Sequence, residues 1–533
     1  MNRREQLGKL TSETCFDMLV IGGGATGSGV ALDAASRGLK VLLAERHDFA
    51  EGTSSRSTKL VHGGVRYLEK AVTHLDRKQY SFVREGLFER GVLLKNAPHL
   101  TKKIEFVTPV YRWLELPYMF IGLKLYDLLS GRMHLGSSRL LSKRETLEKL
   151  PRLNGAHLKG GVLYFDGQFN DARMAVLIIR TAAEHGAVVL NHMDVTSLIK
   201  ENGRVCGAVM KDGVTCAEHT VRAKCVVNAA GPFADGVRRM DDESAKPLLK
   251  TSSGIHIVLD RKFAPTGYGM MIPETDDGRV VFVLPWENHA LIGTTDDPCG
   301  AEEHPAVTDG EIEYVLLQID KYFRTAPRKT DILSAWSGIR PLVMDPHAKN
   351  TEEILREHYI ELSPSGLLTI TGGKWTSYRH MAQDTVDRAV EEFGFAAKPC
   401  ITADLVISGG AGYEPDGYVK LMEQYGLDED TAVHLHHAYG SLAGNVLESG
   451  PVTKLCEAHP YIEAEVSYAV RCEMAEHAVD FLIRRIPLGL LDTAAAKSAA
   501  DRVIRIMAHI LGWDSGRISA ETELAAKRFG TAI

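Results

Sequence analysis

The stretch that most constrains this chain is residues 16–46, where a short apolar run, 17–21, leads into three glycines and an amphipathic helix pattern. Apolar runs rich in β-branched residues are typical of buried parallel strands. A second apolar run, 40–44, follows the helix pattern and ends on Glu45. The order of strand, glycine turn, helix and strand predicts the first βαβ unit of an α/β dinucleotide-binding fold.

The glycines of this turn, Gly22, Gly24 and Gly27, have the spacing G-x-G-x-x-G. In such a motif the first permits a tight turn, the second lets the backbone approach a pyrophosphate, and the third lets helix and strand pack closely. The free N–H groups at the start of the helix then face the phosphates. An acid about 20 residues later, here Glu45, is expected to meet a ribose hydroxyl. A plain glycine-rich turn is the alternative, and the motif does not distinguish FAD from NAD.

The bulk composition narrows the class of protein. At 533 residues the chain is too long for one compact core, so two or three domains are expected. A net charge of −7 argues against a general nucleic-acid binder. The eight cysteines are scattered without a C-x-x-C pair, which argues against a metal cage or disulfide framework and favours a reducing compartment. Residues 1–15 form a polar leader without the apolar core of a secretory signal.

Residues 113–129 come nearest to a membrane-spanning stretch, but Glu115, Pro117, Lys124 and Asp127 interrupt them. We therefore expect no span here. Aromatic and leucine residues beside lysines and arginines favour a helix that lies on a membrane surface. A helix partly buried against another domain is an equally good interpretation.

Several later segments have the residue types of a ligand site. Residues 48–69 combine Ser, Thr and Gly, which can wrap a phosphorylated ligand, although an ordinary surface loop is as good an interpretation. The apolar run 225–229 ends in small residues that suit a second close approach to a cofactor, although a tight turn after a core strand is an equally good interpretation. The run 368–379 repeats the order of apolar strand, glycines and helix, so its helix start would favour negative charge on a ligand.

Residues 251–300 are rich in expected antiparallel strands, and they contain His256 between Ile255 and Ile257. Because side chains alternate along a strand, His256 points to the face opposite these two neighbours. Taken alone, a histidine in a strand is more often structural than catalytic. Beyond residue 399 long helical periodicities predict a helical domain, whose three clustered histidines lack the partners of a metal site.

The glycine motif together with Thr53–Glu69 resembles the respiratory FAD-dependent glycerol-3-phosphate dehydrogenases, within the D-amino-acid-oxidase-like flavoproteins. Five ordered motifs carry the resemblance, at residues 22–27, 53–69, 226–232, 337–342 and 371–379. It implies an α/β FAD-binding domain of Rossmann-like, glutathione-reductase/D-amino-acid-oxidase type, with an inserted antiparallel β substrate domain and a C-terminal α-helical domain. The domains would be a discontinuous FAD-binding domain, 16–398, with inserts near 100–150 and 246–335, and a helical domain, 399–533.

The resemblance also implies the cofactor, FAD. The residues that it assigns to FAD binding are Gly22, Gly24, Ala25, Thr26, Gly27, Glu45, Arg46, Thr53, Ser54, Ser55, Lys59, Leu60, His62, Gly63, Gly64, Val195, Ala230, Gly231, Gly373, Lys374 and Thr376. No metal is expected.

The substrate implied by the resemblance is sn-glycerol 3-phosphate, oxidised to dihydroxyacetone phosphate by hydride transfer from C2 to flavin N5. The residues assigned to substrate are Arg66, Tyr67, His256, Arg340, Arg356 and Lys374. His256 is the expected base, since imidazole accepts a hydroxyl proton near neutral pH. Arg340 stays protonated and is expected to stabilise developing oxyanion charge. Taken alone, each of these arginines would be interpreted as a surface ion-pair partner. Four cations from separated positions suggest a phosphate pocket instead, namely Arg66, Arg340, Arg356 and Lys374.

The electron acceptor expected from the resemblance is a membrane quinone, with the protein cytoplasmic and peripheral on the inner face of the cell membrane. Two alternatives stay open, an oxidase that passes electrons to O2 and makes H2O2, and a flavoprotein with another substrate. A homodimer is also left open.

Overall fold

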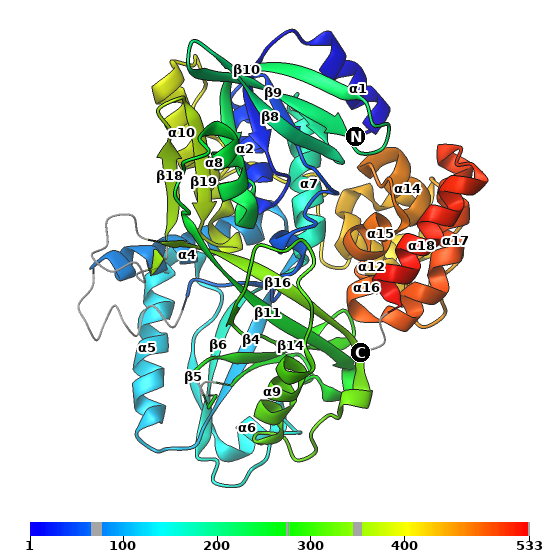
Figure 1. Ribbon diagram of the computed structural model, residues 1–533. Coiled ribbons are helices and arrows are strands. Elements are labelled where there is room, and N and C mark those ends of the chain that lie inside the picture. The colour runs from blue at the N-terminus through cyan, green and yellow to red at the C-terminus, as the bar shows by residue number, and fades with distance from the viewer. Residues whose placement is uncertain (65–76, 273–274, 277, 345–353, 356, 531–533) are drawn as a thin grey trace.

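The computed structural model describes residues 1–64, 77–272, 275–276, 278–344, 354–355 and 357–530. Three parts are visible in Figure 1: an α/β part at the top, a large β-sheet below it, and a helical C-terminal part at the side. Among the described residues, no helix is both long and apolar enough to cross a membrane.

The centre of the α/β part is a parallel sheet with the strand order β18-β19-β10-β1-β2-β7. Along this order each pair from β19 to β7 is parallel, whereas the edge strand β18 is antiparallel to β19. The strands are β1 (Phe16–Ile21), β2 (Val41–Ala44), β7 (Val188–Leu190), β10 (Glu218–Asn228), β18 (His358–Leu362) and β19 (Leu367–Gly372). Parallel strands present their carboxyl ends at one edge, which prepares a ligand site there.

The two faces of this sheet have different covers because its side chains alternate between them. Met18 and Val20 pack with the helices α2 (Ala25–Ser36), α7 (Asp171–Glu184) and α10 (Tyr378–Phe393). Leu19 and Ile21 pack in a second cluster, together with the antiparallel strands β8 (Met193–Glu201) and β9 (Arg204–Asp212) and the helices α1 (Arg3–Ser12) and α8 (Ala234–Asp241). Arg3 of α1 pairs with buried Asp212 at 2.8 Å, so the expected leader is packed onto the α/β part.

The lower sheet has eleven strands in the order β17-β16-β11-β14-β13-β12-β4-β6-β3, with β15 on β11 and β5 on β6. Apart from the parallel pair of β12 and β4, its neighbours are antiparallel. Its strands are β3 (Leu60–Val61), β4 (Thr101–Val110), β5 (Arg139–Ser142), β6 (Gly160–Phe169), β11 (Leu249–Asp260), β12 (Tyr268–Ile272), β13 (Val281–Trp286), β14 (His289–Gly293), β15 (Asp297–Pro298), β16 (Ile332–Met344) and β17 (Ile354–Leu355). The sheet thus extends beyond the expected inserts, since it includes β3, β6 and all of β16.

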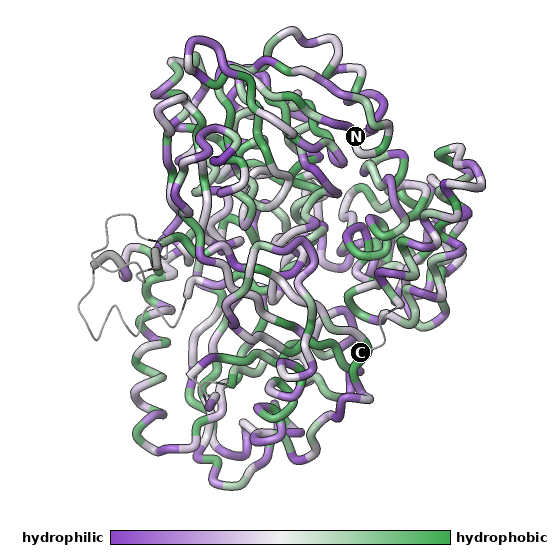
Figure 2. The backbone as a smooth tube through the Cα atoms, in the orientation of Figure 1, coloured by the Kyte–Doolittle hydropathy of each residue, from purple (hydrophilic) through white to green (hydrophobic). Residues whose placement is uncertain are grey.

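Helices flank this sheet, namely α4 (Arg77–Asn96), α5 (Glu115–Leu129), α6 (Lys143–Lys149) and α9 (Asp309–Asp320). Helix α5 stands at the edge of the molecule, and hydrophobic and hydrophilic segments alternate along it in Figure 2. The C-terminal part consists of α11 (Gly417–Tyr425), α12 (Glu429–Tyr439), α13 (Ala443–Leu447), α14 (Glu463–Glu473), α15 (Ala478–Asp480), a π-helical segment (Phe481–Arg485), α16 (Leu488–Leu491), α17 (Thr493–Leu511) and α18 (Ser515–Phe529). These parts confirm the predicted α/β, β-sheet and helical architecture.

Candidate cofactor and substrate site

A cavity of about 920 Å³ lies where the carboxyl ends of the parallel strands meet the lower sheet. Ile21, Ala44 and Gly372 line it from the ends of β1, β2 and β19. His256 and Arg340 line it from β11 and β16 of the lower sheet. The predicted dinucleotide motif and the predicted catalytic residues therefore face one cavity, although Gly22 and Arg340 are 318 positions apart in the sequence.

The glycine loop has the geometry that its spacing predicts. Gly22 has φ +111°, and a Cβ there would lie 2.6 Å from the carbonyl oxygen of Ala229. A Cβ at Gly27 would lie 1.9 Å from the carbonyl oxygen of Gly22, so this glycine lets α2 pack on the loop. Neither position has room for a side chain. The loop therefore brings the N-terminus of α2 to the cavity, where it can receive a pyrophosphate.

The N-terminus of α2 is partly satisfied within the chain. The hydroxyl of Ser54 accepts a hydrogen bond from the N–H of Ala25 at 2.8 Å. A Cβ at Gly24 would lie 2.9 Å from this same hydroxyl oxygen, which explains the middle glycine of the motif. The indole N–H of Trp375 in turn donates to the carbonyl of Ser54 at 2.9 Å. The motif at residues 53–69 and the motif at residues 371–379 are thus connected at the start of α2.

Glu45 closes the loop from the end of β2. Its carboxylate accepts hydrogen bonds from the backbone N–H of Gly23 at 2.6 Å and of His47 at 3.0 Å. Burial raises the pKa of Glu45, and the two hydrogen bonds oppose that rise. The residue lines the cavity, and its contact with a ribose hydroxyl stays a prediction.

Most residues predicted to bind the cofactor line the cavity, namely Gly22, Gly24, Ala25, Thr26, Glu45, Arg46, Thr53, Ser54, Leu60, His62, Val195, Ala230, Gly231, Gly373, Lys374 and Thr376. The described cavity wall does not include Gly27, Ser55, Lys59, Gly63 and Gly64. For Gly63 a packing reason is clear, because a Cβ there would lie 2.6 Å from the Leu87 side chain.

His256 is held on three sides. Its neighbours across the sheet are Gly293 on β14 and Trp336 on β16, and its ring stacks on Trp336 with a centroid distance of 4.3 Å. Its Nε2 and the hydroxyl oxygen of Thr58 are 2.9 Å apart. Burial lowers the pKa of His256 well below its usual value, and the charges of Lys59 and Arg340 lower it further. This direction favours the neutral imidazole, which is the form that accepts a proton.

Arg340 lies in the cavity wall with its guanidinium fixed by the chain. It donates to the hydroxyl of Thr294 at 2.9 Å and to the carbonyl of Thr295 at 3.0 Å. It also pairs with Asp296 at 3.1 Å. Burial lowers the pKa of Arg340, yet an arginine remains charged in proteins. The cavity therefore has a fixed positive charge beside the His256 imidazole.

Of the other predicted substrate residues, Lys374 is described and lines the same cavity. Its ammonium lies 4.8 Å from the centroid of the Phe82 ring. Arg66, Tyr67 and Arg356 lie outside the described residues, so their roles stay predictions. The structure thus brings together two of the four cations expected to hold an anion.

Sequence reasoning missed Arg56 and Thr58 as cavity residues, although both belong to the 53–69 motif. Arg56 donates to the carbonyl of Glu303 at 3.0 Å, and burial lowers its pKa to about 9. Its position inside the motif was a usable signal. The contact of Arg56 with Glu303 had no signal in the sequence, because Glu303 lies in a loop of the lower sheet that carries no motif.

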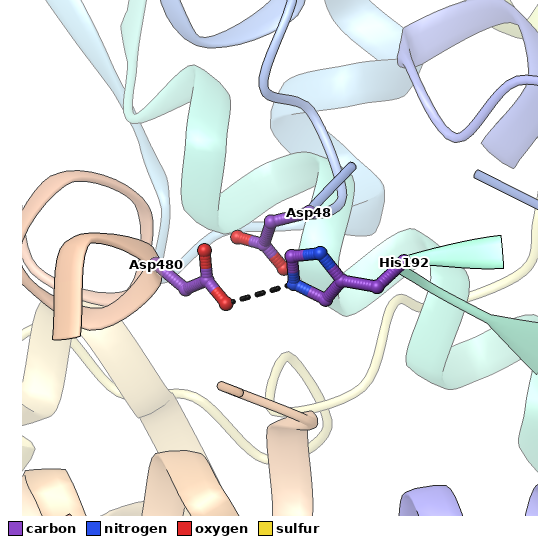
Figure 3. A group of neighbouring side chains, drawn as sticks. All are labelled: Asp48, His192 and Asp480. Carbon is purple, nitrogen blue, oxygen red and sulfur yellow. Dashed lines mark hydrogen bonds and ion pairs between the residues drawn. The ribbon is translucent and has the colours of Figure 1, made fainter. Parts of the chain in front are cut away.

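One group outside the cavity has the geometry of a metal site. Asp48, His192 and Asp480 bring their ligand atoms within 4.8 Å of one another, as Figure 3 shows. However, Asp48 pairs with Arg484 at 2.5 Å and with Arg485 at 2.7 Å, and His192 pairs with Asp480 at 3.0 Å. Two guanidinium groups already balance the two carboxylates. We therefore interpret the group as a buried ion-pair network between the α/β part and the C-terminal helices.

The residues of the cavity fit FAD. A Cβ at Gly22 or Gly27 would clash with the backbone, and the start of α2, which lines the cavity, suits a pyrophosphate. A volume of about 920 Å³ is within the range of cofactor cavities.

Comparisons with known proteins agree with this fit. The family described as FAD dependent oxidoreductase matches residues 17–379, and the family described as C-terminal domain of alpha-glycerophosphate oxidase matches residues 400–518. The chain is 47% identical to the mitochondrial glycerol-3-phosphate dehydrogenase of Mesocricetus auratus, over 99% of this chain and 75% of that protein. It is 46% identical to the human protein of the same name, with the same coverage of both chains.

Among solved structures, the glycerol-3-phosphate dehydrogenase from Bacillus halodurans complexed with FAD matches with a TM-score of 0.81 and 32% identity. This match covers 99% of this chain and 97% of that chain. The L-alpha-glycerophosphate oxidase from Mycoplasma pneumoniae matches at 17% identity with a TM-score of 0.57, over 73% of this chain and 98% of its own, which shows a shared fold alone. The chain therefore belongs to the FAD-dependent oxidoreductases, with FAD as its cofactor, and among them to the glycerol-3-phosphate dehydrogenase family.

Proposed function

We propose that this chain oxidises sn-glycerol 3-phosphate to dihydroxyacetone phosphate and passes the electrons to a membrane quinone. The observation that carries the proposal is that His256, Arg340 and Lys374 line the same cavity as the glycine loop. A neutral base and two cations beside a dinucleotide site suit a small anionic alcohol. The names of the relatives, which match 99% of this chain, support the same substrate.

Each described residue has a chemical task in this reaction. His256 takes the proton of the C2 hydroxyl, since its imidazole is neutral. Arg340 stabilises the oxyanion that develops at C2, and Lys374 binds the substrate's negative charge with it. FAD, when bound, supplies the acceptor for the hydride from C2. Arg66, Tyr67 and Arg356 complete the proposed substrate pocket by the family resemblance.

Helix α5 and the residues before it are the proposed membrane-contact surface. Trp113 is 67% exposed, Leu114 86%, Ile121 69% and Leu128 76%, which is an unusual density of exposed apolar side chains. Leu114, Ile121 and Leu128 recur every seven residues and therefore share one helix face. Arg112, Lys124 and Arg132 are exposed beside them and suit anionic headgroups.

The location proposed with this surface is the cytoplasm, peripheral on the inner face of the cell membrane. A peripheral position brings the protein to its quinone without a spanning helix. A homodimer belongs to the same proposal.

The first test is anaerobic addition of glycerol 3-phosphate to the purified yellow protein, with flavin absorbance recorded. Prompt bleaching that a quinone analogue reverses, and that air reverses only slowly, is the expected result. No bleaching by glycerol 3-phosphate would leave the FAD site and refute the substrate, as for a flavoprotein with another substrate.

A second candidate function is an oxidase that passes electrons to O2 and makes H2O2. The match of residues 400–518 to the C-terminal domain of alpha-glycerophosphate oxidase favours keeping it. Prompt reoxidation by air with stoichiometric peroxide would select the oxidase over the quinone-dependent enzyme.

A further inference from the structure

A loop of the lower sheet, residues 299–308, reaches the cofactor cavity from the side opposite the glycine loop. It connects β15 with α9, and its residues Ala301, Glu303 and His304 line the cavity. The loop is exposed along most of its length. A solvent-exposed loop keeps one position only where side chains hold it there, so its contacts are informative.

Both ends of this loop are fixed to the lower sheet. The N–H of Cys299 donates to the carbonyl of Thr251 on β11 at 3.2 Å, and the Thr251 hydroxyl donates to the carbonyl of Cys299 at 2.6 Å. At the other end, the hydroxyl of Thr308 accepts from the N–H of Glu311 at 3.3 Å and caps α9. The residues between these ends extend to the α/β part.

Glu303 makes the first connection to the α/β part. Its carboxylate pairs with Arg46 at 3.3 Å, and Nε2 of His47 lies 3.2 Å from the same oxygen. Arg46 and His47 directly follow Glu45, the residue predicted to meet a ribose hydroxyl. The guanidinium of Arg46 also lies 4.1 Å from the ring centroid of Phe233, another residue of the cavity wall. Arg46 is thus held between Phe233 and the loop at the predicted ribose end of the cavity.

Arg56 makes the second connection, from within the 53–69 motif. Its Nη1 donates to the carbonyl of Glu303 at 3.0 Å, and its Nη2 lies 3.0 Å from Nδ1 of His304. Arg56 is 8% exposed, so these contacts are largely shielded from water. On its other side, His304 places Nε2 3.7 Å from the carboxylate of Glu51. The loop therefore contacts the segment 46–56, which forms part of the cavity wall.

We propose that residues 299–308 form a strap over the ribose end of the FAD site, that Glu303 positions Arg46 there, and that FAD leaves only when this strap lifts. The cofactor is then retained by two parts of the molecule, the glycine loop of the α/β part and a loop of the lower sheet. The proposal rests on FAD as the cofactor and holds whichever substrate the enzyme oxidises.

The contacts of the strap differ in strength. The side chains of Arg46 and Glu303 are 33% and 46% exposed, and exposed ion pairs stabilise only weakly because water and salt screen them. The contacts of Arg56 are stronger, since a buried charged donor loses more when its partner is removed. A strap with one buried anchor and one exposed pair can lift while the lower sheet stays folded.

The test is the rate of FAD dissociation, measured from the flavin fluorescence that appears when the FAD-loaded protein is diluted. In Glu303→Gln the rate should rise about threefold or more, because two weak contacts are lost. In Arg56→Met it should rise about tenfold or more. A direct effect of charge on the anionic cofactor would change the two rates in opposite directions, because one variant removes a negative charge and the other a positive one. Loss of the strap raises both rates.

Glu302→Gln is the matched control, since Glu302 is an exposed carboxylate in the same loop that does not line the cavity. Its FAD dissociation should match the wild type. The difference between Glu303→Gln and the wild type should shrink at high ionic strength, and both proteins should unfold at the same temperature without FAD.

FAD dissociation from Glu303→Gln at the wild-type rate or more slowly would refute the strap. A lowered unfolding temperature of Glu303→Gln without FAD would also refute it, because Glu303 would then stabilise the fold rather than retain the cofactor. If Arg56→Met does not load FAD, Glu303→Gln decides alone, since charge alone would slow its release of FAD.

Discussion

Replacement of Gly27 by alanine tests whether the glycine loop is a close-packed support for the cofactor. A Cβ there would lie 1.9 Å from the carbonyl oxygen of Gly22, whereas real Cβ atoms essentially never approach below 3.0 Å. The N-terminal turn of α2 must therefore move away from the loop by about 1 Å or more. The oxygen in contact belongs to the backbone of a residue that is itself confined by Ala229, so the loop cannot yield easily.

The expected change in the free energy of unfolding is the balance of two effects. Glycine to alanine within a helix stabilises by up to about 1 kcal/mol, while overpacking of a buried site costs about 1–3 kcal/mol or more. The free energy of unfolding should therefore fall by about 1–2 kcal/mol. FAD affinity should fall by about tenfold or more, because the helix start that receives the pyrophosphate has moved.

The assay is thermal unfolding with and without added FAD, together with FAD dissociation measured by flavin fluorescence. Gly8→Ala is the matched control, since Gly8 lies in helix α1 and its Cβ would have no neighbour within 4 Å. That variant should unfold at the wild-type temperature or slightly above it. Wild-type FAD affinity and stability in Gly27→Ala would refute the argument.

Three further predictions follow from the site and the surface. His256→Asn should lower the rate of flavin reduction by about 100-fold or more while FAD content stays constant, because the proton acceptor is lost; an unchanged rate would exclude His256 as the base. Arg340→Ala should raise the KM for glycerol 3-phosphate and reduce the preference for it over glycerol by about tenfold or more. An unaltered preference, measured by steady-state kinetics, would refute the assignment of Arg340. The double variant Leu114→Asp/Ile121→Asp should lose binding to anionic vesicles in a sedimentation assay, whereas Leu524→Asp, at an exposed position of α18, should retain it. Equal binding by both variants would exclude α5 as the contact surface.

Local patterns predicted the elements that depend on local forces. The apolar runs 17–21 and 40–44 correspond to β1 (Phe16–Ile21) and β2 (Val41–Ala44), because a buried strand needs apolar residues at both faces. The face of His256 also followed from alternation, as Ile255 and Ile257 lie in the core of the lower sheet.

The partner of a buried charged side chain could not be predicted from the sequence. Lys59 was expected at the cofactor because its motif lies there, but the left-handed backbone at this residue and the distant Asp171 direct its side chain into the core. Likewise, the membership of β6 in the lower sheet depends on pairing with β4 and β3, which no local pattern specifies. Such contacts depend on long-range packing, and no periodicity records them.

The ion pair between Asp48 and Arg485 has a consequence for synthesis of the chain. It joins residues 437 positions apart, and it holds the segment between Arg46 and Thr53, two residues of the cavity wall. While the chain is growing, Asp48 has neither of its two arginines until the end of the π-helical segment has left the ribosome. The glycine loop can form from nearby residues, whereas we expect this wall of the cofactor site to be completed only after residues 484 and 485 have been synthesised. We therefore expect FAD to load only after these arginines are in place, since a chain truncated before residue 484 would leave the buried carboxylate of Asp48 without its counter-charges.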